Sequence, residues 1–281
     1  MMKKKNGFTK KYVILNSFQD LISGRPCDPE INSGRRKRGF TLAEVLITLG
    51  IIGVVAAMTI PTLMANNQKT QYVSALKKAY TTWNQVLVKM AADEGSPGDL
   101  SKSGLFAAGT TDATFGEEVV KYFNVVKICR SGESGCIKYN SMMYDGSTPA
   151  GFSEDTTDFR FITADGVSYV VSNYAGGAPN CAMDTMNMYS WSNGIGAIYQ
   201  ICGALDIDVN GLKGPNNFGR DIFRFTITNG RGPQLYPLGG IEDANYTWKA
   251  DDGTMNNCHA GNTDGKACAA RVIEEGWEMN Y

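Results

Sequence analysis

The apolar side chains of this sequence begin with a nearly continuous run that extends from Phe40 to Ala65. The run is 26 residues long and is the only one of such length in the chain. A helix needs about 20 residues to cross a hydrocarbon core of roughly 30 Å. The pattern therefore predicts a membrane-spanning helix over residues 40–65, followed by the polar residues Asn66, Asn67, Gln68 and Lys69.

Beyond residue 65 the apolar positions recur every three or four residues, which is typical of one face of an amphipathic helix. The periodic positions are Tyr72, Val73, Leu76, Ala79, Tyr80, Trp83, Val86, Leu87 and Met90. Gly95, Pro97 and Gly98 follow and predict that the helix ends near residue 94. We interpret its aromatic residues as a packing face.

The rest of the chain contains short alternating or apolar segments that predict strands. The clearest pair is residues 159–163 and 167–171, which Ala164, Asp165 and Gly166 join as a hairpin. Further strands are expected at residues 125–129, at 197–202 together with 205–209, and at 221–227, and a short final helix at 267–277. We expect an α+β fold, with a long N-terminal helix packed on a C-terminal antiparallel sheet.

Charge is divided unevenly along the chain. The 281 residues are 43% apolar and 20% charged with a net charge of −1, which excludes a disordered chain and a uniformly basic nucleic-acid binder. Residues 1–39 carry 10 basic and 3 acidic side chains (+7), and residues 40–281 carry 17 and 25 (−8). Four basic residues, Arg35 to Arg38, directly precede the apolar run. They predict a cytoplasmic N-terminus and an exported C-terminal part.

Glu44 is an acid inside the predicted membrane helix, where an unpaired carboxylate costs several kcal/mol. A plain signal anchor fits the length of the run but leaves Glu44 unexplained. A cleaved secretory signal, cut near Ala57, has an apolar region of only about 7 to 15 residues. Cleavage between Gly39 and Phe40 explains the acid, because it creates a positive α-amino group four residues before Glu44.

The segment from Lys37 to Ile47, Lys-Arg-Gly-Phe-Thr-Leu-Ala-Glu-Val-Leu-Ile, resembles the cleavage and methylation motif of type IV pilins and type II secretion pseudopilins. The resemblance implies that a prepilin peptidase cuts after Gly39 and that Phe40 is N-methylated. It also implies that Glu44 neutralises the amine of a neighbouring subunit during assembly and that Pro61 kinks the helix. The implied organisation is a removed leader (1–39), a membrane and filament-core helix (40–65) and a periplasmic or extracellular domain (66–281).

The implied leader is long, and it contains a near-copy of the cleavage site. The segment Lys4-Lys5-Asn6-Gly7-Phe8-Thr9 parallels Lys37-Arg38-Gly39-Phe40-Thr41, but the first copy is followed by no apolar run and has no acid at the fifth place. We interpret the excess as an insertion that duplicated the Gly-Phe-Thr junction, with chance similarity among lysine-rich leaders as the alternative.

Seven cysteines are present, and removal of the leader would discard Cys27 and leave six on the oxidising side of the membrane. Six cysteines allow 15 connectivities, so proximity alone ranks them. Pairing of nearest neighbours predicts the disulfides Cys129–Cys136, Cys181–Cys202 and Cys258–Cys268.

Oxygen donors at alternate positions, Asp206, Asp208 and Asn210, precede Gly211 as at the start of a calcium loop. Asn217 stands where an EF-hand has its closing acid, so Asp221 is the residue expected to close a Ca²⁺ site. The resemblance to pseudopilins, which often hold calcium late in the sheet, favours this site. The alternative is a tight turn between two strands.

Signals for catalysis are poor. Gly132-Glu133-Ser134-Gly135 superficially matches a serine nucleophile loop, but the only histidine, His259, is distant in sequence. Cys258, His259 and Cys268 are also a conceivable zinc set, for which a disulfide is the better interpretation.

The sequence thus predicts a non-enzymatic structural subunit of a type IV pilus or type II secretion pseudopilus. Its expected location is the bacterial inner membrane and then the filament. Its expected partners are the peptidase, other pilin or pseudopilin subunits and an inner-membrane assembly platform, without nucleic acid. The alternatives are a minor tip pilin that binds a surface, DNA or a secreted substrate, and a membrane-anchored periplasmic enzyme.

Overall fold

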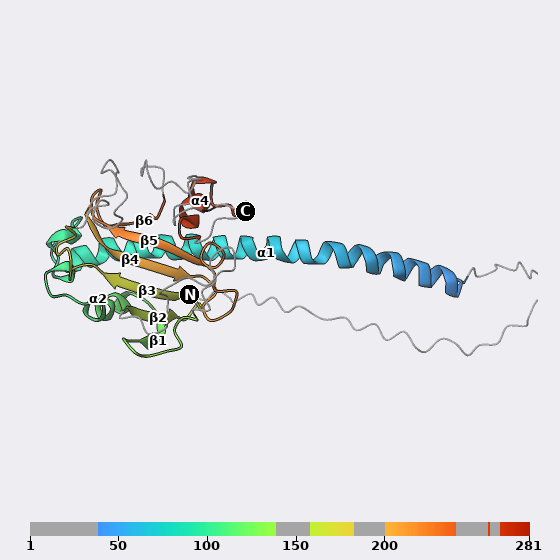
Figure 1. The fold of residues 1–281 in the computed structure, drawn as a ribbon, viewed down its shortest axis with the longest axis horizontal. Helices are drawn as coiled ribbons and strands as arrows, with labels where there is room; N and C mark the ends of the chain where they lie inside the picture. Colours follow the sequence, from blue (N-terminus) through green and yellow to red (C-terminus); the bar gives the residue numbers. More distant parts are fainter. Residues whose placement is uncertain (1–38, 139–157, 183–199, 240–257, 259–264) are drawn as a thin grey trace, which may run out of the picture. The chain divides into compact units, whose positions relative to one another are not determined.

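The computed structural model describes residues 39–138, 158–182, 200–239, 258 and 265–281 (Figure 1). Two units are distinguished, residues 1–54 and residues 55–281. In the first unit the described residues are the non-helical segment 39–41 and the start of helix α1, which extends from Leu42 to Asp93. The second unit contains the remainder of α1, the sheet and the shorter helices, and its described elements form the body considered below.

The sheet of the body has six antiparallel strands in sequence order, so each strand pairs with the one that follows it. The strands are β1 (Val125–Cys129), β2 (Phe159–Thr163), β3 (Ser168–Asn173), β4 (Ile201–Asp208), β5 (Ile222–Thr228) and β6 (Gln234–Pro237). Helices α2 (Asp112–Val119) and α4 (Cys268–Glu274) and three short 3₁₀ turns complete the described elements. The turns are η1 (Leu100–Lys102), η2 (Gly104–Phe106) and η3 (Val120–Tyr122). The predicted α+β fold is confirmed.

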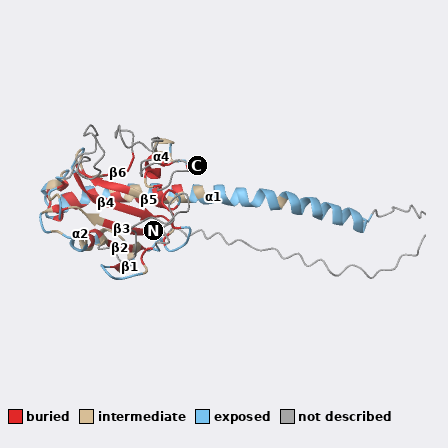
Figure 2. Cartoon of the chain, in the orientation of Figure 1, coloured by how far each residue is buried: buried red, intermediate tan, exposed pale blue. Residues whose placement is uncertain are grey.

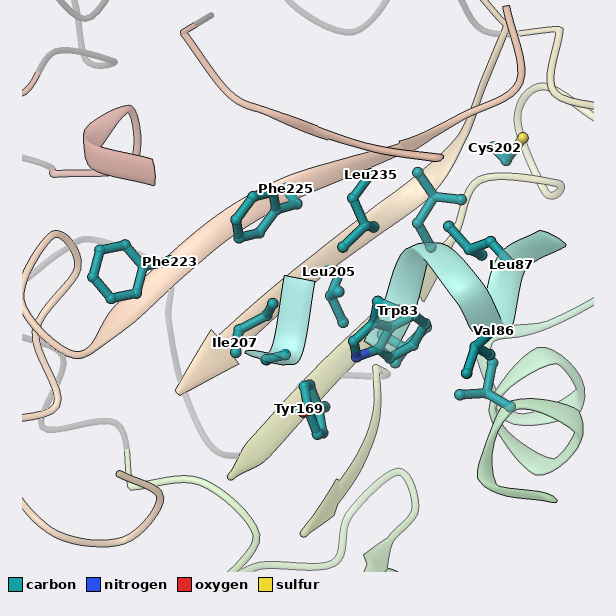
Figure 3. Close-up of a cluster of buried hydrophobic side chains, with 14 of the residues drawn as sticks. Trp83, Val86, Leu87, Tyr169, Cys202, Leu205, Ile207, Phe223, Phe225 and Leu235 are labelled. Carbon is teal, nitrogen blue, oxygen red and sulfur yellow. The ribbon is translucent and has the colours of Figure 1, made fainter. Parts of the chain in front are cut away.

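One face of α1 is buried in the core of the body. Its buried residues are Val73, Leu76, Ala79, Trp83, Val86, Leu87, Met90 and Ala91, which follow the predicted periodicity. Trp83 is fully buried, and its ring centroid lies 5.1 Å from that of Phe123 and 5.7 Å from that of Tyr169 on β3. Figure 3 shows Trp83 among side chains from β3, β4, β5 and β6. The helix and sheet therefore share a single aromatic-rich core.

The β2–β3 hairpin is confirmed, with β3 extending to Asn173. Gly166 has a φ of 86°, which a residue with a side chain rarely adopts, and its N–H donates to the carbonyl of Thr163 at 2.8 Å. The final helix α4 lies within the predicted range but is shorter, ending at Glu274.

The apolar segments 197–202 and 205–209 belong to one strand, β4, which begins at Ile201 and continues through Gly203 to Asp208. A Cβ at Gly203 would lie 2.2 Å from the carbonyl oxygen of Ser172 on β3. The glycine therefore permits a close approach within the sheet, where the sequence pattern indicates a break. Residues 197–199 lie outside the described residues.

Gly116 on α2 shows how tightly the described body is packed. A Cβ at this position would lie 2.1 to 2.6 Å from the ring atoms of Phe159 on β2, which is buried and cannot move aside cheaply. Gly176, by contrast, is exposed and has nothing within 4 Å of a built Cβ.

We therefore expect Gly116→Ala to lower the free energy of unfolding by about 1 to 3 kcal/mol, because the added methyl group overpacks the core. Urea unfolding of the purified chain in detergent, followed by tryptophan fluorescence, measures the difference. The control is Gly176→Ala, which should unfold like the wild type. Equal midpoints for all three proteins would contradict the packing described here.

Candidate functional site

The first candidate site is the segment that leads into α1. Gly39 and Phe40 precede the helix without regular secondary structure and are exposed, Phe40 to 87%. Nothing lies within 4 Å of a Cβ built on Gly39. The described chain therefore does not shield the peptide bond between these two residues.

Thr41 and Glu44 hydrogen-bond each other reciprocally at the start of α1. The N–H and hydroxyl of Thr41 donate to Glu44 Oε2 at 2.8 and 2.9 Å, and the N–H of Glu44 donates to Thr41 Oγ1 at 3.2 Å. This is a capping box, in which a threonine and a glutamate three residues later satisfy free N–H groups. The role of Thr41 was not predicted from the sequence, although the Thr-x-x-Glu spacing is the signature of a capping box.

The N-terminal part of α1 exposes large apolar side chains around its circumference, and Figure 2 colours it almost entirely as exposed. Among the described residues, α1 is the one helix long and apolar enough to cross a membrane, and none of its most apolar window is buried. The exposed apolar residues of this part are Leu42, Val45, Leu46, Ile47, Leu49, Ile51, Ile52, Val54, Val55, Met58, Ile60, Leu63 and Met64. Such a surface needs lipid or another apolar partner.

Pro61 lies inside α1, and the helix continues through it. Because proline has no N–H, the carbonyl of Ala57 receives no hydrogen bond from it. The expectation that the helix bends at this position stays a prediction.

The second candidate site is a buried polar cluster at the end of β4 and the loop that leads to β5. The side chains of Asp208 and Asp221 are both fully buried. The N–H groups of Asn216 and Asn217 donate to the Asp221 carboxylate at 2.7 Å each. Asp208 Oδ1 accepts from the N–H of Asn210 at 3.2 Å, whereas its Oδ2 has no hydrogen-bond partner among the described residues.

Two asparagine side chains of this loop also hold oxygen atoms that have no donor. The side-chain oxygens of Asn210 and Asn217 are buried without a partner among the described residues. The Asn216 amide, by contrast, is satisfied when its nitrogen donates to the carbonyls of Lys213 and Gly211, at 2.9 and 3.1 Å. Buried carboxylate and amide oxygens without donors are ligands that a hard cation accepts.

The two buried carboxylates also influence each other. Burial raises the pKa of Asp208 well above its usual range, and the negative charge of Asp221 raises it further. Burial likewise raises the pKa of Asp221, although the N–H groups of Asn217 and Asn216 oppose the shift. In the described chain alone, negative charge at this site is therefore poorly compensated.

Asp206 was predicted to belong to this cluster, but it does not. Both of its oxygens accept from the guanidinium of Arg224 on the paired strand β5, at 2.6 Å each. In a bidentate ion pair of this kind, both oxygens of the carboxylate are hydrogen-bonded within the sheet. The spacing of Asp206, Asp208 and Asn210 could not reveal this, because the arginine is 18 residues away in sequence.

The structure pairs Cys129 with Cys136, Cys181 with Cys202, and Cys258 with Cys268, the pairs that proximity predicts. The last disulfide also removes the thiolates that a zinc site would need. Ser134 lies on a loop, and His259 lies outside the described residues. Within the described ranges, no group of three or more His, Cys, Asp or Glu side chains is placed to hold a metal.

Comparisons with known proteins point to the N-terminal site. Residues 34–60 match the model of the prokaryotic N-terminal methylation motif. The chain is also similar to the type II secretion system core protein G of several bacteria. It is 43% identical to the Pectobacterium carotovorum subsp. carotovorum protein over 44 residues, which are 16% of this chain and 28% of that protein. Over 35 residues it is 46% identical to the Klebsiella pneumoniae protein, covering 12% and 25% of the two chains.

The similarity thus spans little more than a quarter of these relatives, and it identifies the segment around the start of α1 as a prepilin-type motif. No solved structure matches the chain.

Asp208 and Asp206 on β4 test the electrostatics of the second site. Asp206 is paired with the cation of Arg224, whereas Asp208 has no positive partner among the described residues. In the presence of a chelator at neutral pH, we expect Asp208→Asn to raise the free energy of unfolding by about 1 to 3 kcal/mol, since it removes an uncompensated buried charge. We expect Asp206→Asn to lower it, because it breaks the ion pair with Arg224.

Chemical denaturation of both variants and the wild type measures these differences. The gain from Asp208→Asn should shrink as the pH falls toward the ordinary pKa of an aspartate, because the wild-type carboxyl then becomes neutral as well. Destabilisation by both substitutions in chelator would show that the charge of Asp208 is compensated after all.

Proposed function

We propose that this chain is the precursor of a pilin-like structural subunit, which a prepilin peptidase cuts between Gly39 and Phe40. The observation that carries the proposal is the prepilin-type motif at the start of a helix whose apolar side chains are exposed. The exposed, non-helical Gly39–Phe40 segment supports it, because a protease needs access to an extended peptide. Hydrolysis would leave a carboxylate on Gly39 and a free amine on Phe40, and methylation of that amine would follow.

The new amine gives Glu44 a partner. In the precursor, the Glu44 carboxylate is held by neutral donors of Thr41, which do not balance its charge. After cleavage, the ammonium group of Phe40 on another copy would supply the positive charge, and the pairing would be strong because the surroundings are apolar. This pairing would set the register of subunits as their apolar helices come together.

We further propose that the subunit resides in the inner membrane with its N-terminus in the cytoplasm before it enters a filament. The four basic residues before the apolar run support this orientation. The relatives named for the type II secretion system favour a secretion pseudopilus, and the subunit would act mechanically rather than as an enzyme. A minor tip pilin remains the second candidate, because the described body contains turns and helices beyond the sheet itself.

Replacing Glu44 tests the assembly step. We expect Glu44→Gln to be processed normally but to enter filaments at least tenfold less well. The Phe40 ammonium group would then be buried without its partner, which costs several kcal/mol. The measurement is an immunoblot of sheared filaments and membranes from the bacterium that encodes the chain.

Glu94→Gln is the matched control, because Glu94 is an exposed acid beyond the end of α1 and should not affect assembly. Filaments of the Glu44→Gln variant at the wild-type level would contradict the proposed pairing. If cells with the Glu44→Gln variant form no filament but keep the activity that depends on this chain, a membrane-anchored protein outside any filament would be favoured instead.

We also propose that the loop between β4 and β5 binds Ca²⁺. The donors that fit are the carboxylates of Asp208 and Asp221 and the side-chain oxygens of Asn210 and Asn217. The buried oxygens of Asp208, Asn210 and Asn217 that have no partner among the described residues support this assignment. Calcium accepts six to eight oxygen ligands and tolerates carbonyl and amide donors, whereas Mg²⁺ demands a tighter octahedron.

Thermal unfolding with calcium or magnesium tests this site. We expect calcium at about 100 times its dissociation constant to stabilise the protein by roughly 2.7 kcal/mol. Magnesium should have a smaller effect, and Asp221→Asn should abolish the response to calcium. Identical transitions in calcium and in chelator would rule out the calcium proposal and leave the pilin proposal intact.

A further inference from the structure

Tyr72 connects helix α1 to the polar loop after β4. It lies on α1 at the start of the buried face and is itself half-buried. Its hydroxyl accepts a hydrogen bond from Asn210 Nδ2 at 3.1 Å, across 138 residues of sequence. The same nitrogen donates to the carbonyl of Gly214 at 3.2 Å, so the Asn210 amide is held by the helix and by its own loop.

Asn210 in turn contacts the buried acids. Its backbone N–H donates to Asp208 Oδ1 at 3.2 Å. Burial raises the pKa of Asp221, and the Asn210 amide opposes that shift after the N–H groups of Asn217 and Asn216. Burial also raises the pKa of Tyr72, and the negative charges of Asp221 and Asp208 add to this shift. Hydrogen bonds therefore link Tyr72 on α1 through Asn210 to Asp208, beside Asp221.

The opposite side of the loop is pressed against the β2–β3 turn. A Cβ at Gly211 would lie 2.4 Å from the carbonyl oxygen of Gly166 and 3.3 Å from Ser168 Oγ. Within the part of the chain that the structure describes, the polar contact between that turn and α1 is the exposed ion pair of Lys78 with Asp165, at 2.7 Å, and exposed pairs contribute little. Among the described residues, the Tyr72–Asn210 hydrogen bond is thus the partly buried polar link between this end of the sheet and α1.

We infer that Tyr72 is a positioning residue for the cation loop, and that a bound divalent cation stabilises the attachment of α1 to the sheet through Asn210. The inference rests on the proposed calcium site. Cation binding would fix the loop from 209 to 221, and the Asn210 amide would carry that order to the helix. In a filament subunit, this link would make the junction between helix and body depend on calcium.

The test uses the full chain in detergent and compares Tyr72→Phe with the wild type. Calcium affinity is measured by titration calorimetry, and amide hydrogen exchange is followed in calcium and in chelator. In the wild type, calcium should slow exchange both in the loop and in α1 around residue 72. In Tyr72→Phe, affinity should fall about three- to tenfold, as expected for one lost hydrogen bond, and protection of α1 should disappear while that of the loop persists.

Tyr80→Phe is the matched control. Tyr80 lies on the same helix, and its hydroxyl makes one long contact, 3.5 Å, to the carbonyl of Leu235, away from the cation loop. This variant should bind calcium and protect α1 like the wild type.

The outcomes separate the two proposals. A wild-type chain that binds no calcium overturns the cation site and with it the role of Tyr72. A wild-type chain that binds calcium, with the same affinity and the same α1 protection in Tyr72→Phe, leaves the cation site standing and overturns the inference.

Discussion

Helix α1 is one continuous helix with two different kinds of surface along its length, and the rest of the structure depends on this. From Val73 onward, one face of the helix is buried against the sheet and the other is polar. Between Leu42 and Met64, apolar side chains point outward around the circumference. Apolar surface left in water costs about 25 cal/mol for each square ångström, so this second part of the helix requires lipid or other subunits. The described body thus has its own buried core, whereas the N-terminal part of α1 still lacks an apolar partner among the described residues.

Charged groups follow the same logic. Glu44 and Asp208 are acids in places where the described chain offers them polar contacts but no positive charge. Asp206 shows the contrast, since Arg224 on the paired strand neutralises it within the sheet. A carboxylate without a counterion in apolar surroundings is costly, and proteins keep such groups when another molecule completes them. The proposed partners, a neighbouring amine for Glu44 and a calcium ion for Asp208, answer the same electrostatic requirement.

The features predictable from the sequence are those determined by local pattern. The spacing from Tyr72 to Met90 predicts the buried face of α1, and Asp165 and Gly166 predict the hairpin turn, because periodicity and turn chemistry act over a few residues. The disulfide pairs also follow from short separations in sequence. The reciprocal hydrogen bonds of Thr41 and Glu44 could also have been predicted from the spacing of these two residues, although they were not.

Features that depend on distant partners could not be predicted in this way. Gly203 interrupts the apolar pattern, but β4 continues through it. Because glycine has no side chain, the backbone of Ser172 on the neighbouring strand β3 can approach closely. Asp206 matches a calcium pattern until Arg224 is known to face it. Helix α2 and strand β6 were missed, because α2 is only eight residues long and β6 only four, too short to show a clear period.

The chemical state of the Phe40 amine is the most direct test of the central proposal. Mass spectrometry of the membrane-extracted protein, with and without a prepilin peptidase, determines where the mature chain begins. We expect a product that starts at Phe40 and carries one additional methyl group when the peptidase is present, and the intact chain when it is absent. A leader that stays attached in the presence of an active peptidase, or a cut near Ala57, would contradict the proposal.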